Sequence, residues 1–140
     1  MKIEKLDHVH VEVTDREAAA EWYMRVLGLS RHAEFAAWAA HPQGPLILAA
    51  SHGEPTVSLF AGASGGVTRD NTVAFRVSGD TFLAFLNSLG DLALVNRFGA
   101  IVTREQVQDH DVSLSVYFVD PDQNRIEITT YDYDLVRRAL

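Results

Sequence analysis

The strongest constraint on this fold is an order of elements that occurs twice in 140 residues. Valines at positions 9, 11 and 13 alternate with polar residues, which predicts a strand with one apolar face. A capping sequence at 14–17 then opens an amphipathic helix that should end at Gly28. A second strand at 72–77 leads in the same way into a helix that starts near Ser78 and stops at Gly90.

Each half continues with further predicted strands. They cover 35–38, 45–50 and 56–60 in the first half, and 98–103, 113–118 and 125–130 in the second. The alanines of 35–38 would suit a helix equally well, but the flanking turns favour a strand. Each half is therefore βαβββ. Because one half cannot cover both faces of its sheet, we predict an α+β fold in which two βαβββ modules pair about a pseudo-twofold axis and form a cupped sheet with an internal cavity.

The repeat also sets the expected domain limits. Module one covers about 1–61, a glycine-containing linker covers about 62–71, module two covers about 72–132, and a C-terminal tail covers 133–140. Together they form a single domain, because 140 residues is too short for two full-sized domains.

Composition narrows the classes of function. The absence of cysteine excludes a disulfide scaffold, a thiol nucleophile and a thiolate metal site. A net charge of −7 without a basic run argues against nucleic acid as a partner. No apolar stretch approaches the roughly 20 residues that span a bilayer, and the N-terminus lacks a signal-peptide core, so we expect no membrane association and a cytoplasmic location.

The polar faces of the predicted strands carry mainly His, Ser, Thr and Tyr. The sets are His8, His10 and Glu12; Thr56, Ser58 and Phe60; Thr72, Ala74 and Arg76; Ser113, Ser115 and Tyr117; and Arg125, Glu127 and Thr129. A solvated sheet face usually carries more Lys and Glu, so this composition favours a wettable cavity, and the solvated face is the alternative.

Aligning the two halves places Thr72 opposite His8 and Ser58 opposite Glu127. Imidazole and carboxylate groups are ligands that Fe²⁺, Mn²⁺, Ni²⁺ and Zn²⁺ accept, so four positions would converge on a candidate divalent-metal site. Only two of the four carry strong ligands.

The chain resembles the vicinal oxygen chelate superfamily, which includes glyoxalase I, fosfomycin-resistance thiol transferases, extradiol dioxygenases, methylmalonyl-CoA epimerase and the bleomycin-binding proteins. The resemblance covers essentially the whole chain, and its most specific parts are 6–9, 22–29 and 117–128. It implies that His8 and Glu127 bind a catalytic divalent ion, and that paired modules form a homodimer. Tyr117 lies ten residues before Glu127, as does the acid/base tyrosine of extradiol dioxygenases, and His110 is near the position of a histidine in those enzymes.

The sequence also departs from this family. Metal-dependent members usually carry a second histidine where this chain has Thr72, and glyoxalase I carries a glutamate where it has Ser58. His10 could supply the third ligand or could line the cavity. Arg76 could bind a substrate anion or pair with Glu12.

We therefore predict a metal-assisted enzyme, of the glyoxalase, dioxygenase or thiol-transferase type, whose small substrate chelates the ion through two oxygens. Glu127 and Tyr117 are the expected catalytic residues, and His8 and Glu127 the metal ligands. The alternative is a metal-free protein that sequesters a drug or metabolite. The residues expected to line the cavity and contact the substrate are His10, Ser58, Thr72, Arg76 and Ser115.

Overall fold

The computed structural model describes residues 7–62 and 71–140. The chain divides into two compact units, residues 1–65 and 66–140, and each is described by itself. The linker expected at 62–71 lies, apart from its two end residues, outside the described residues.

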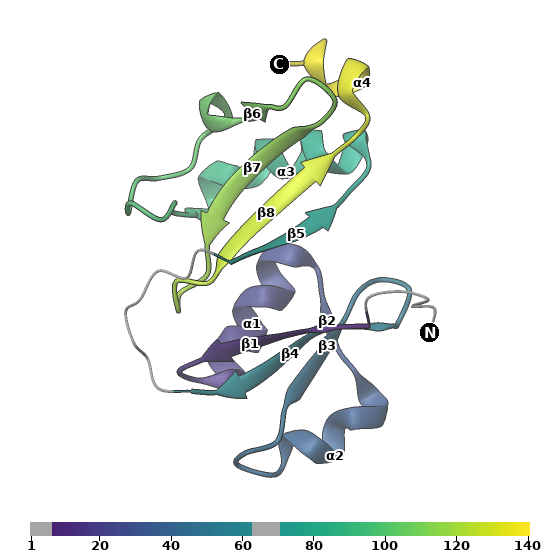
Figure 1. The fold of residues 1–140 in the computed structure, drawn as a ribbon, viewed down its shortest axis with the longest axis vertical. Coiled ribbons are helices and arrows are strands. Elements are labelled where there is room, and N and C mark those ends of the chain that lie inside the picture. Colours follow the sequence, from purple (N-terminus) through teal and green to yellow (C-terminus); the bar gives the residue numbers. More distant parts are fainter. Residues whose placement is uncertain (1–6, 63–70) are drawn as a thin grey trace. The chain divides into compact units, whose positions relative to one another are not determined.

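Unit 1 is a four-stranded sheet with helices, coloured purple to blue in Figure 1. Its elements are β1 (Val9–Val13), α1 (Arg16–Leu27), β2 (Ser30–Arg31), η1 (Ala33–Phe35), α2 (Ala36–Ala39), β3 (Leu46–Ala49) and β4 (Pro55–Ala61). The strand order is β1-β4-β3-β2, and β1 runs parallel to β4 whereas the other pairs are antiparallel. Parallel strands need a long connection, and the chain between β1 and β4 contains α1, β2, η1, α2 and β3.

The apolar face of this sheet is covered by α1, which packs against β3 and β4. Tyr23 of α1 is buried, as are Val57 and Leu59 of β4. Gly28 ends the helix with a positive φ of 65°, a conformation that glycine adopts without steric cost. The opposite face of β1 is left for the polar side chains.

Unit 2 repeats this arrangement and is coloured teal to yellow in Figure 1. Its elements are β5 (Thr72–Arg76), α3 (Gly79–Leu92), η2 (Arg104–Gln106), β6 (Gln108–Asp109), β7 (Leu114–Val119), β8 (Arg125–Thr130) and α4 (Tyr133–Arg137). The strand order is β5-β8-β7-β6, with β5 parallel to β8. Figure 1 shows α3 along one face of the sheet, where Phe82, Leu86 and Phe118 are buried.

The predicted fold class is confirmed, since both units have the βαβββ order of an α+β fold. The pairing of the modules about a pseudo-twofold axis, and a cavity formed by that pairing, stay predictions. No helix in the described parts of the chain combines the length and apolar character needed to cross a membrane.

The strand predicted at 35–38 is wrong. These residues form the end of η1 and most of α2, and the outer strand of the sheet is the two-residue β2. Alanine favours helix, and Phe35 and Trp38 are three residues apart, so their rings pack together in a tilted arrangement with centroids 4.6 Å apart.

The strand predicted at 98–103 is also wrong. The side chain of Asn96 accepts hydrogen bonds from the backbone N–H groups of Phe98 and Ala100, and Gly99 has a φ of 77°. These features form a turn, and pairing is reduced to an isolated bridge between Val95 and Ile101. The outer strand of unit 2 is β6, two polar residues without an alternating pattern.

Helix ends differ slightly from the prediction. The N-cap of α1 is Asp15, whose carboxylate accepts hydrogen bonds from the N–H groups of Glu17 and Ala18, so the predicted capping pair of Thr14 and Glu17 is not used. Helix α3 continues through Gly90 and ends after Leu92, because Ala93 adopts the left-handed conformation instead.

Candidate functional site

Two histidines face each other on the polar side of unit 1. His8 immediately precedes β1 and His10 lies within it, so strand alternation directs both side chains to one face. Their rings stack with centroids 5.1 Å apart, and the two Nε2 atoms are 3.2 Å apart. Two imidazole nitrogens therefore converge on one point.

The carboxylate of Asp7 fixes the tautomer of His8. Its Oδ2 atom lies 2.6 Å from Nδ1 of His8, which donates its proton to the carboxylate. In the neutral imidazole, Nε2 of His8 then carries the lone pair, and the Nε2–H of His10 donates to it. A carboxylate behind a histidine is the usual support of a metal-ligating imidazole.

A buried hydroxyl lies beside this pair. Ser58 of β4 is in register with His10 and is only 1% exposed. Within the described residues its Oγ has no hydrogen-bond partner, which is costly for a buried hydroxyl unless a ligand or water supplies one. Phe60 packs its ring 4.6 Å from that of His10 and closes the other side.

The carboxylate of Glu127 is the centre of the polar face of unit 2. Glu127 lies in β8, and Ser115 of the neighbouring β7 donates a hydrogen bond of 2.7 Å to its Oε1. The fully buried Ser115 hydroxyl also lies 3.0 Å from Oγ1 of Thr129. This chain of hydroxyls holds one oxygen of the Glu127 carboxylate in place.

Tyr117 lies directly across from Glu127 in the β7–β8 register. Its hydroxyl is 3.3 Å from Nε2 of His110. Burial, followed by the negative charge of Glu127, raises the pKa of Tyr117 above its usual value of 10.0. The phenol therefore keeps its proton at neutral pH.

The resemblance to extradiol dioxygenases places His110 near, but not at, the position of a histidine in those enzymes, and no periodic pattern connects it to Tyr117. The contact arises from the short β6–β7 connection, which returns residue 110 to the side of β7. The sequence feature that could have suggested this contact is the spacing of seven residues between His110 and Tyr117, with a turn between them.

Thr72 and Arg76 of β5 share the face of Glu127, since Ala74 between them is the register partner of Glu127. The guanidinium of Arg76 lies over the ring of Tyr131, with its central carbon 5.0 Å from the ring centroid. Arg76 is thus held by an aromatic ring of its own unit.

The predicted site residues fall into two groups. His8, His10 and Ser58 share a face of unit 1, whereas Glu127, Tyr117 and Ser115 share a face of unit 2 with Thr72 and Arg76. In the described ranges, no group of three or more His, Asp or Glu side chains is arranged to hold a metal ion. Unit 1 offers two imidazoles and unit 2 offers one oriented carboxylate.

The chain is similar to several proteins of known structure. The structure of the oxidase ChaP-H1 is similar, with a TM-score of 0.65 and 25% identity, covering 94% of this chain and 98% of that one. The fosfomycin resistance protein FosX from Mesorhizobium loti has a TM-score of 0.66 and 19% identity, covering 99% of this chain and 100% of that one. No curated protein matches in sequence. A family model matches residues 5–128. The chain therefore belongs to the Glyoxalase/Bleomycin resistance protein/Dioxygenase superfamily.

Proposed function

We propose that this protein is a metal-assisted oxidising enzyme that acts, with O₂, on a small substrate bearing two neighbouring oxygens. The divalent ion would be held by His8, His10 and Glu127. The observation that carries the proposal is the separation of 3.2 Å between the Nε2 atoms of His8 and His10.

This separation fits two ligands of one ion. Imidazole nitrogens bound at about 2.1 Å, at an angle between about 90° and 110°, lie about 3.0–3.4 Å apart. Ion binding requires His10 to move its proton from Nε2 to Nδ1, which costs little in a neutral imidazole. His8 already presents its lone pair because of Asp7.

The donor set supports iron among the candidate ions Fe²⁺, Mn²⁺, Ni²⁺ and Zn²⁺. Two histidines and one carboxylate with open positions are typical of non-haem Fe(II) oxygenases. A relative at 25% identity is named an oxidase. When bound, such an ion supplies Lewis acidity and electrons for reaction with O₂.

The surrounding residues of the chain would then have distinct tasks. Asp7 holds the His8 ring, and Ser115 holds the Glu127 carboxylate, so both ligands need little reorganisation. Tyr117 would keep the proton on its hydroxyl, because its pKa is raised, and would donate a hydrogen bond to an anionic oxygen of the substrate. His110 is within reach to share that proton.

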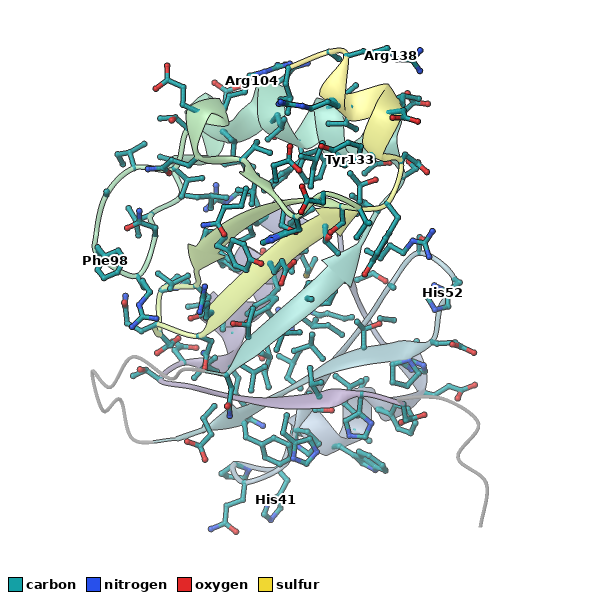
Figure 2. All side chains as sticks on the ribbon, turned by 45° about the horizontal axis from the view of Figure 1, so that its top comes forward. His41, His52, Phe98, Arg104, Tyr133 and Arg138 are labelled. Carbon is teal, nitrogen blue, oxygen red and sulfur yellow. The ribbon has the colours of Figure 1, made fainter. Side chains whose placement is uncertain are left out.

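The test is metal loading of tag-free protein. Protein incubated without oxygen with Fe²⁺, Mn²⁺, Ni²⁺ or Zn²⁺ and then desalted should retain about one ion per chain. His8→Ala and Glu127→Ala should abolish retention, and His10→Ala should weaken affinity at least about tenfold. His52→Ala is the control, because His52 is exposed on a loop of unit 1 and contacts Glu54 (Figure 2).

A metal-free binding protein is the second candidate. It is favoured by Thr72, a poor ligand at the position where metal-dependent relatives usually carry histidine. Wild-type retention below about 0.1 ion per chain with all four metals would refute the enzyme and leave this candidate.

A further inference from the structure

Unit 2 contains a cavity of about 340 Å³ that the metal-site residues do not fill. Its walls are the turn 96–98, the segment 105–108 and the sheet residues Tyr117, Phe118 and Arg125. We call it the arginine cavity. Its volume lies at the lower end of the range for small-molecule sites and suits a ligand of one or two rings.

Arginine is the commonest charged residue in the walls of the arginine cavity. Arg97 and Arg125 line it together with one carboxylate, Glu105, although the whole chain carries a net charge of −7. Guanidinium groups in a cavity wall favour an anionic ligand.

Arg125 is placed to recognise the anion. Its guanidinium lies over the Tyr117 ring, with the central carbon 4.9 Å from the ring centroid. In the described parts of the chain no carboxylate forms an ion pair with it. A stacked guanidinium keeps its N–H groups in its own plane, where they can bind both oxygens of a carboxylate.

Aromatic surface completes the cavity. Phe98 is 83% exposed, although the turn that carries it is fixed by hydrogen bonds to Asn96. Arg97 lies over the Phe98 ring at 5.3 Å. Figure 2 shows Phe98 on the loop beside the sheet. Phe98 and Tyr117 therefore give an aromatic ligand two ring surfaces to contact.

We propose that the arginine cavity binds a small aromatic carboxylate, with the carboxylate on Arg125 and the ring against Phe98 and Tyr117. This deepens the proposed function, because Tyr117 also neighbours Glu127. Binding of the carboxylate does not depend on the proposed function; only the claim that this ligand is a substrate rests on it.

The test compares 2-naphthoate with its neutral analogue 2-naphthamide by calorimetry. Tag-free protein, both metal-loaded and treated with a chelator, should bind the acid at least about tenfold more tightly than the amide. Equal affinity for the two probes, or binding of neither, would overturn the inference. Binding of the acid only with metal present would also overturn it, because the ligand would then sit on the ion and not in the cavity.

Three variants assign the contacts. Arg125→Gln should remove the preference for the acid, and Phe98→Ala, on an exposed turn that needs no core packing, should weaken both probes. Arg138→Gln is the control, since Arg138 is the C-cap residue of α4 and lies well away from Phe98 in Figure 2. Retention of the acid preference by Arg125→Gln, or unchanged binding by Phe98→Ala, would contradict the assignment. Metal retention in the loading experiment is independent of these results, so either proposal can fail alone.

Discussion

At the scale of single residues, the polar side chains support one another in short chains. The Asp7 carboxylate accepts a hydrogen bond from His8. The Ser115 hydroxyl contacts both Thr129 and the Glu127 carboxylate. Strand alternation in the sequence places His10 beside His8, and Ser115 and Glu127 on one face. The hydrogen bond of Ser115 depends on the β7–β8 register, which alternation alone does not fix.

Ser115→Ala tests whether this support matters for the metal. Removing the donor to Oε1 frees the Glu127 carboxylate to rotate, so affinity for the ion should fall about tenfold or more while the fold is retained. Metal titration of the variant measures the loss. Ser88→Ala is the control, because the Ser88 hydroxyl donates a hydrogen bond within α3, to the carbonyl of Phe85. Equal affinity in both variants would remove Ser115 from its positioning role.

Tyr117 should report the charge of Glu127. Burial and then the carboxylate raise the pKa of Tyr117, so Glu127→Gln should lower that pKa by removing the second cause. Phenolate absorbance measured against pH, with Tyr117→Phe subtracted, isolates this residue. Because the pKa is higher in the folded state, the stability that Tyr117 contributes is complete below about pH 10 and is lost as the pH rises further. An unchanged midpoint in Glu127→Gln would mean that the carboxylate does not act on the phenol.

Thr72→His distinguishes the two possible sources of a third ligand. Thr72 shares the face of Glu127, so an imidazole there could serve in place of His10. If His10 is a ligand, Thr72→His alone should gain much less than tenfold in metal affinity. In the His10→Ala background it should restore at least about tenfold, equivalent to about 1.4 kcal/mol. A large gain in metal affinity from Thr72→His in the wild-type background would argue that His10 does not occupy the third ligand position.

At the scale of elements, hydrophobic periodicity predicted the long strands and helices that bury one face. The strand predicted at 125–130 agrees residue for residue with β8, and both long helices begin where capping residues stand. The outer strands β2 and β6 could not be predicted from the sequence, because they have two residues each and no buried face. Their positions are set by pairing with β3 and β7, and local pattern does not encode such pairing.

The two glycines of α3 should respond in opposite ways to alanine. A Cβ on Gly79 would lie 2.9 Å from side-chain atoms of Asp132 and Leu135, so Gly79→Ala should lower the free energy of unfolding by about 1–3 kcal/mol. At Gly90 nothing lies within 4 Å of the added Cβ, and Gly90→Ala should raise it by up to about 1 kcal/mol. Thermal denaturation compares them. A Gly79→Ala variant as stable as the wild type would contradict the close packing of α4 on the start of α3.

At the scale of the whole molecule, the two units use equivalent positions differently. His10 pairs in register with Ser58, as Ala74 pairs with Glu127, which matches the alignment of the repeat made from sequence. Unit 1 therefore carries its proposed ligands at the start of its first strand, whereas unit 2 carries its proposed ligand on its last strand.

The sheets also bear on the assembly of the protein. In each unit the first strand, β1 or β5, lies at the edge of its sheet and pairs on one side only within that sheet. Unpaired strand edges are normally covered, and symmetric pairing of two copies is the commonest way for a chain to bury further surface. We expect a homodimer, so light scattering at micromolar concentration should give twice the chain mass of 15.5 kDa. Lysine substitution of Val9, a half-buried residue of β1, should weaken any association that uses this edge, and an unchanged dimer would place the interface elsewhere. A wild-type mass near that of one chain would rule the dimer out.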